Sequence, residues 1–130
     1  MLSSLKHPFV FLLIISINAF SCKSKTASSS SETKIAFGSC GDQDWPQPAL
    51  KIAADLKPDA FVFLGDNIYG DTDNMDTLRN KYKRWAAQSS YQNLEKNVPI
   101  FAVWDDHDYG RNDSGKYYPW KTQSKEIFMD

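Results

Sequence analysis

The chain carries almost no net charge, and this limits the partners it can bind. Its 130 residues include 15 Lys and Arg and 16 Asp and Glu, so the formal charge is −1. A nucleic-acid-binding protein needs a concentrated basic face, and this balance gives no reason to expect one. The sequence also lacks an internal repeat and the Gly-x-Gly-x-x-Gly and Gly-Lys-Ser/Thr loops of nucleotide-binding domains. A doubly wound nucleotide-binding domain is therefore a weak alternative.

No apolar run is long enough to cross a bilayer. Residues 8–20 form a run of about 13, whereas a spanning helix needs about 20 residues. The run follows a short positive start and ends in Ala-Phe-Ser-Cys22, an order typical of a bacterial lipoprotein signal with a lipidated cysteine. An ordinary secretory signal cleaved nearby is the alternative, and a buried core helix is less favoured. We predict a signal peptide over residues 1–22, export to the periplasm or cell surface, and a membrane anchor at Cys22.

The next segment predicts a tether, and the remainder predicts one folded domain. Residues 23–33 are polar and rich in serine, without apolar periodicity, which is typical of a flexible linker. Residues 34–130 are enough for a modest core. Aromatic residues make up 14% of the chain, and so disorder is not expected of the body.

Cysteine and histidine are scarce, with two of each in the chain. Two cysteines in an exported protein ordinarily favour one disulfide. If Cys22 carries a lipid, however, Cys40 remains a lone thiol in an oxidising compartment, where a thiol needs a reason to persist. His7 falls within the signal, and His107 is thus the imidazole of the folded body.

The body alternates short apolar runs with helical patterns. Strands are predicted at residues 34–38, 60–64 and 99–104, and helices at 48–57, from 73–76 to about 87, and at 119–130. Tyr91 and Leu94 either extend the second helix or form a further turn. This order predicts an α/β fold with a parallel sheet and right-handed crossovers. The continuous apolar run at 60–64 predicts a strand covered on both faces.

A polar cluster follows each of the three predicted strands. Residues 39–42 contain Ser-Cys-Gly-Asp, residues 66–71 contain three polar or acidic side chains and a tyrosine, and residues 105–108 read Asp-Asp-His-Asp. In parallel sheets, ligands bind beyond the carboxyl ends of the strands. Turn formation explains a single acidic cluster, but three clusters at three strand ends predict one site.

The residue types at this edge favour a metal centre. Asp66 follows a buried strand and a glycine, and is well placed to bridge two cations. Beside a cation the phenol of Tyr69 and the thiol of Cys40 can lose their protons. Ferric iron suits such ligands, whereas calcium and magnesium take carboxylates and carbonyls.

The third cluster supplies the remaining candidates. Asp106 is a candidate ligand of a second metal, and His107 a general acid or a cation facing developing charge. Two such ions clamp a phosphate oxygen and activate water. Alone, Cys40 reads as a small buried hydrophobe, Tyr69 as a packing aromatic and His107 as a surface imidazole. Together they predict a site.

Three blocks resemble the alkaline phosphatase D (PhoD-like) metallophosphoesterases. They are Phe37-Gly-Ser-Cys, Gly65-Asp-Asn-Ile-Tyr-Gly-Asp and Trp104-Asp-Asp-His-Asp-Tyr-Gly. The similarity covers residues 34–130. A Gly-Asp-x-x-Tyr block also occurs in purple acid phosphatases and alone indicates only the calcineurin-like superfamily. The cysteine after the first strand and the Trp-Asp-Asp-His-Asp block favour alkaline phosphatase D.

The resemblance implies roles for single residues. It implies that Cys40, Asp66 and Tyr69 bind Fe³⁺ and that Asp66 bridges to Ca²⁺, although other divalent metals are possible. Asp106 takes the place of the asparagine in the superfamily's Gly-Asn-His-Glu/Asp block, and His107 matches its histidine. Candidates for contact with substrate phosphate are Asn67, within the second block, and Arg111 and Asn112, just past the third.

The resemblance also implies a larger enzyme. The family fold is an α/β/β/α sandwich, in which these β-α-β-α-β elements form part of one sheet. Family members continue past this length and bring further His and Asp ligands. We therefore expect the N-terminal part of a metal-dependent hydrolase of phosphomonoesters or phosphodiesters. The alternative is a non-catalytic surface lipoprotein that keeps half of a metal or phosphate site. The sequence gives no basis for an oligomer.

Overall fold

The computed structural model describes residues 32–130 of the chain. The predicted signal peptide, the predicted lipidation site Cys22 and most of the predicted tether lie outside the described residues. Within residues 32–130, every helix is too short or too polar to cross a membrane.

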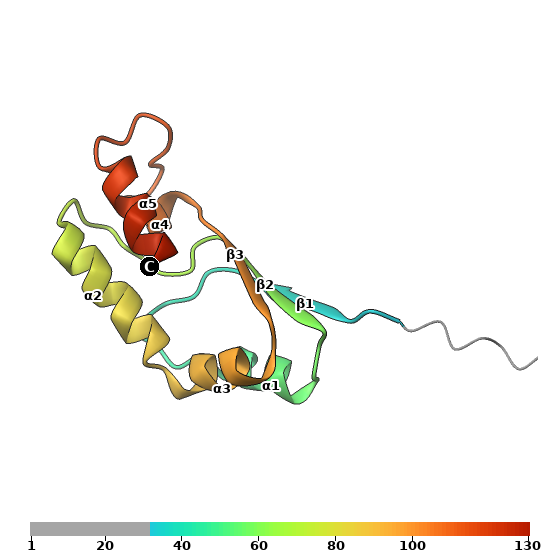
Figure 1. Cartoon of the computed structure of the whole chain (residues 1–130). Helices are drawn as coiled ribbons and strands as arrows, with labels where there is room; N and C mark the ends of the chain where they lie inside the picture. Colours follow the sequence, from blue (N-terminus) through green and yellow to red (C-terminus); the bar gives the residue numbers. More distant parts are fainter. Residues whose placement is uncertain (1–31) are drawn as a thin grey trace, which may run out of the picture. The chain divides into compact units, whose positions relative to one another are not determined.

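A three-stranded parallel sheet organises the described chain (Figure 1). The strands β1 (Ile35–Gly38), β2 (Ala60–Leu64) and β3 (Ile100–Val103) lie in chain order, with Phe37 opposite Val62 and Val62 opposite Phe101. The helices are α1 (Pro48–Asp55), α2 (Met75–Ala86), α3 (Ser89–Asn97), α4 (Asp106–Tyr109) and α5 (Lys121–Met129). The predicted α/β class, the parallel sheet and the β-α-β-α-β order are confirmed.

The core lies between one face of the sheet and the helices. In Figure 1, α1 and α3 lie next to each other beside the sheet, and α2 packs against α5. The ring of Phe63 lies 4.7 Å from that of Phe61 and 6.0 Å from that of Trp85, measured between centroids. The other core residues come from the helices and the segments beside them: Leu50, Ala54, Leu78, Leu94, Val98 and Ile127, with Ile68.

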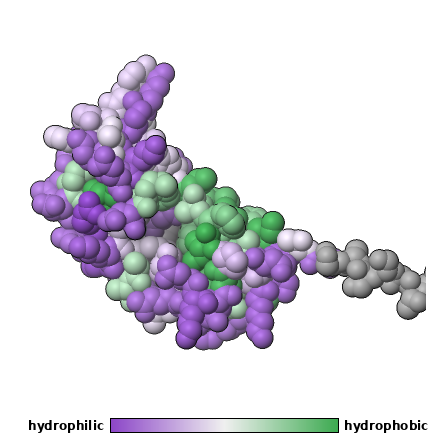
Figure 2. All heavy atoms as spheres, viewed as in Figure 1, coloured by the Kyte–Doolittle hydropathy of each residue, from purple (hydrophilic) through white to green (hydrophobic). Residues whose placement is uncertain are grey.

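The opposite face of the sheet is apolar and open. Figure 2 shows hydrophobic side chains gathered over the strands. The prediction that β2 is covered on both faces is wrong for the part of the chain that the structure describes: Phe61 and Phe63 are buried, but Leu64 is exposed. The reason is that α1 and α3 cover one face alone. Neighbouring strands expose the same face through Ile35, Phe37, Phe101 and Val103.

Helices α2 and α3 are separate, which decides between the alternatives that the sequence left open. The side chain of Asn74 caps α2 by accepting a hydrogen bond of 2.9 Å from the Thr77 N–H. The chain then leaves helical geometry at Gln88, which is the N-cap of α3. Leu94 is fully buried on α3, and so this segment is a helix with its own contact to the core.

The short helix α4 was not predicted. Asp105 is its N-cap, and Asp105 and Asp108 form a capping box, in which each side chain accepts a backbone N–H of the other residue. Burial raises the pKa of the Asp108 carboxyl, against the hydrogen bonds that lower it. Two of the three acids in the cluster at residues 105–108 thus stabilise the turn, and Asp106 and His107 project between them.

Candidate metal centre

Left-handed backbone positions bring the ends of β1 and β2 together. Cys40 has a φ of 58° and Asp66 a φ of 50°, next to Gly65 at 101°. Non-glycine residues rarely adopt such φ values, since surrounding contacts must hold the backbone in this conformation. Residues with such φ values are frequent at functional sites. Here the Gly41 N–H donates a 2.7 Å hydrogen bond to the Asp66 carbonyl. The bond connects the two strand ends that carry the predicted ligands Cys40 and Asp66.

Three predicted site residues converge at the carboxyl edge of the sheet. Asp66, Asp106 and His107 each offer one ligand atom, and these atoms all lie within 4.8 Å of one another. The structure thus brings together residues about 40 positions apart in the sequence. We name the side chains of Asp66, Asp106 and His107 the metal cluster, a term that here means three candidate ligands and not a group of ions.

The other two predicted ligands adjoin the metal cluster. The Sγ atom of Cys40 lies 3.8 Å from Oδ2 of Asp66. The ring of Tyr69 lies tilted against the ring of His107, with the two centroids 4.4 Å apart and an angle of 57° between the ring planes. Carboxylate, imidazole, thiol and phenol groups therefore lie close together, and their role as metal ligands stays a prediction.

Within residues 32–130, neither Asp66 nor Asp106 forms a salt bridge. Oδ1 of Asp66 is buried and has no hydrogen-bond partner. Burial raises the pKa of Asp66, His107 lowers it, and the charge of Asp106 raises it further. For Asp106, partial burial acts to raise the pKa, but hydrogen bonds from the Asp113 and His107 backbone outweigh it and lower the pKa. A cation would satisfy the orphaned oxygen and the repulsion together.

Tyr69 is held in its neutral form unless a cation is near. A hydrogen bond with the Cys40 side chain, burial and the negative charges of Cys40 and Asp66 raise the pKa of Tyr69 to about 12. Each of these neighbours is itself a potential ligand. A bound cation would reverse the effect, because it stabilises the phenolate and the thiolate.

Asp71 orients the imidazole of His107. Its Oδ1 atom lies 2.8 Å from Nδ1 of His107, whose side chain is 14% exposed. A carboxylate on one ring nitrogen fixes the tautomer and leaves Nε2 for a ligand or substrate. Sequence reasoning gave Asp71 no role, although its place two residues after Tyr69 in the same loop was visible.

Comparison with solved structures now bears on the fold. No family model matches the chain, and no curated protein matches it. A solved structure of PhoD matches with a TM-score of 0.64 over 75% of this chain. The described chain has a PhoD-like fold. The two sequences are 17% identical, so the match shows the fold alone, and this chain spans about a quarter (24%) of the PhoD chain.

The three predicted substrate contacts already have bonding partners within the chain. Arg111 pairs with Asp73, and Asn112 donates to Asp113. Asn67 is 5% exposed, and its Nδ2 donates to the Val103 carbonyl at 2.8 Å. Their predicted contact with substrate phosphate stays a prediction, and the burial of Asn67 disfavours a direct contact.

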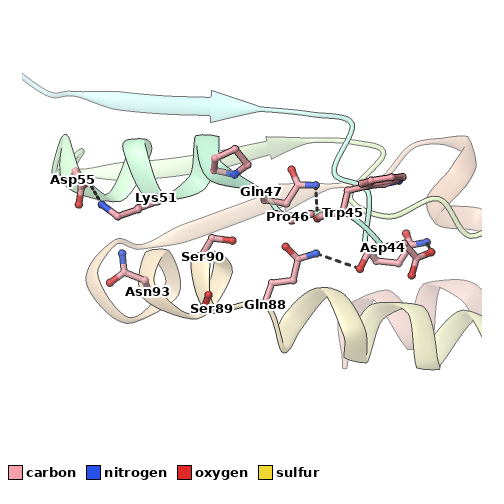
Figure 3. Close-up of a pocket in the computed structure, with 12 residues that line it drawn as sticks. Asp44, Trp45, Pro46, Gln47, Lys51, Asp55, Gln88, Ser89, Ser90 and Asn93 are labelled. Atoms are coloured by element: carbon pink, nitrogen blue, oxygen red, sulfur yellow. Dashed lines mark hydrogen bonds and ion pairs between the residues drawn. The ribbon is translucent and has the colours of Figure 1, made fainter.

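A large cavity lies apart from the metal cluster. It has a volume of about 810 Å³ and lies between residues 43–48, α1 and the start of α3. Figure 3 shows the ion pair of Lys51 and Asp55 at one end of it. None of the three metal-cluster residues lines it. The link between the two places is Gln43, whose Oε1 accepts a 2.9 Å hydrogen bond from the Tyr69 N–H.

Proposed function

We propose that this chain carries part of the metal centre of a phosphoric ester hydrolase similar to alkaline phosphatase D. The convergence of Asp66, Asp106 and His107 at the carboxyl edge of a parallel sheet is the observation that carries the proposal. The PhoD-like fold supports it, and so does the resemblance of the three sequence blocks.

The donor set supports two kinds of cation. Cys40, Asp66 and Tyr69 would hold Fe³⁺, since thiolate and phenolate suit a ferric ion. Asp66 and Asp106 would hold Ca²⁺, which prefers carboxylate oxygens. When bound, such ions supply Lewis acidity toward a phosphate ester. The buried, unpartnered Oδ1 of Asp66 is the feature that fits them best.

The residues of the chain would divide the remaining work. Asp66 and Asp106 would fix the position of the phosphate through the ions that they hold. His107 would act in its doubly protonated form, with Nδ1–H held by Asp71 and with Nε2 not bound to an ion. It would then donate the Nε2 proton to the leaving oxygen or offset developing negative charge. Asp71 would hold Nδ1 and keep the ring in one orientation.

Asp71→Asn is expected to slow turnover of p-nitrophenyl phosphate about 10- to 100-fold, the usual cost of losing such an orienting carboxylate. The steady-state rate should fall while metal content remains. Asp73→Asn is the matched control, because Asp73 pairs with Arg111 instead of His107. Equal rates for Asp71→Asn and the unaltered chain would contradict the role of Asp71.

A second candidate is a surface protein that binds metal or phosphate without hydrolysis. It is favoured by the buried, unpartnered Oδ1 of Asp66, because a cation would satisfy this oxygen whether or not hydrolysis takes place. The two candidates are separated by assaying the full chain, loaded with Fe³⁺ and Ca²⁺, against p-nitrophenyl phosphate and bis-p-nitrophenyl phosphate. Turnover that is lost in His107→Ala with metal retained supports the hydrolase. Metal uptake without turnover favours the binding protein. The absence of both metal uptake and turnover would contradict both candidates.

We also propose that the protein is exported and anchored to a membrane through a lipid on Cys22. The support is the order of positive start, short apolar run and small residues before the cysteine. Cells expressing the chain and fed a radioactive fatty acid should label it, and Cys22→Ser should abolish the label. Equal labelling of Cys22→Ser would contradict the proposal, and Cys40→Ser is the matched control.

A further inference from the structure

A fully buried carboxylate lies behind the metal cluster. Asp108 is 0% exposed. Its oxygens accept hydrogen bonds from the Asn67 N–H at 3.1 Å, the Asn67 Nδ2 at 3.0 Å and the Ile68 N–H at 3.3 Å. On the other side they accept the Asp105 N–H at 3.0 Å. One side chain therefore ties the loop after β2 to the end of β3, about 40 residues further along the chain.

No basic side chain pairs with Asp108 within residues 32–130. Its remaining donor is the hydroxyl of Tyr82 on α2, at 2.8 Å. Every polar contact of the Asp108 carboxylate is thus a hydrogen bond that its oxygens accept from an N–H or O–H group. Burying a charge this way has a large desolvation cost, and in some proteins a buried charge of this kind specifies a geometry. The geometry specified here is the distance between two backbone segments.

Those two segments carry the metal cluster. Asp66 directly precedes Asn67, and Asp106 and His107 lie between Asp105 and Asp108. A shift of either segment would move one part of the cluster away from the other. We infer that Asp108 is a positioning residue that sets the spacing of Asp66 from Asp106 and His107. The inference rests on the proposed function to the extent that the cluster binds a metal ion.

The test compares the unaltered full chain with its variants in their affinity for Mn²⁺. The affinity is read from the loss of the free-ion signal in electron paramagnetic resonance. Asp108→Asn keeps the size of the side chain but replaces one carboxylate oxygen by an NH₂ group. This group cannot accept a hydrogen bond from the N–H donors that surround it. We expect its Kd for Mn²⁺ to rise about 10- to 100-fold, as for other outer partners of metal ligands.

Tyr82→Phe separates positioning from simple stabilisation. It removes one donor from the same carboxylate but leaves both bonded segments in place, and so its Kd should stay within about threefold of the unaltered chain. A purely structural role predicts that both variants lower the melting temperature and leave Kd unchanged in the folded protein. Folded Asp108→Asn with unaltered Kd would overturn the inference.

If Asp108→Asn fails to fold, Asn67→Ala provides the same test with a smaller change. It removes only the Nδ2 bond to Asp108 and the bond to the Val103 carbonyl. A Kd raised more than in Tyr82→Phe is the expected result, and a Kd equal to that of Tyr82→Phe would overturn the inference. Failure of the unaltered chain to bind Mn²⁺ would instead remove the proposed metal site itself, and the inference with it.

Discussion

Asp66→Asn is expected to weaken metal binding by more than about 100-fold, because loss of a direct ligand should exceed the 10- to 100-fold cost of losing an outer partner. Oδ2 of Asp66 lies 3.8 Å from Sγ of Cys40, and a carboxylate oxygen of Asp66 lies within 4.8 Å of the ligand atoms of Asp106 and His107. An asparagine keeps the shape and also tolerates the left-handed backbone at φ 50°. The measurement is metal content after dialysis, by mass spectrometry of the elements.

The same variant should leave the fold intact. Burial raises the pKa of Asp66, which means that its charged form is disfavoured in the folded chain without a cation. Removing the charge should therefore keep or raise the metal-free stability near neutral pH. Asp76→Asn, an exposed change on α2, is the matched control and should bind metal normally. Full metal content in Asp66→Asn would contradict the assignment of the site.

Phe63→Ala is expected to cost about 3–5 kcal/mol of unfolding free energy, the usual range for removing a buried aromatic ring. Phe63 is 5% exposed, and its ring lies against Phe61, Trp85 and Tyr91. It joins the sheet to α2 and α3, and so the cavity left behind cannot be filled by one neighbour. Urea unfolding followed by tryptophan fluorescence measures the change.

Phe101→Ala is the matched control for Phe63→Ala. Phe101 is 61% exposed on the open face of the sheet. Its removal should change the unfolding free energy by less than about 1 kcal/mol, as for other exposed positions. Equal losses for the two variants would contradict the described fold, because they would mean that the open face is as well packed as the core.

The sequence predicted the sheet because each strand is a short apolar run that a turn or proline bounds. It also predicted the site edge, since the carboxyl ends of parallel strands must lie together. Cys40, Asp66 and Asp106 each lie two or three residues after the end of a strand. Their placement therefore needed only the strand assignments and the rule for crossovers.

The supporting contacts could not be predicted, because they join residues distant in sequence. Nothing in the local pattern pairs Asp71 with His107 or Asp108 with Asn67. The four-residue helix α4 could not be predicted either, because it is too short to show an apolar period of 3.6 residues. Similarly, an apolar run in β2 does not reveal whether one or both faces are covered by other elements.

The most direct test of the metal centre is a crystal structure of the full chain loaded with Fe³⁺ and Ca²⁺, with data collected at the iron absorption edge. The account predicts an anomalous peak in contact with Asp66, Cys40 and Tyr69, at the carboxyl edge of the sheet. Folded protein with no peak there, or with iron bound only elsewhere, would contradict it.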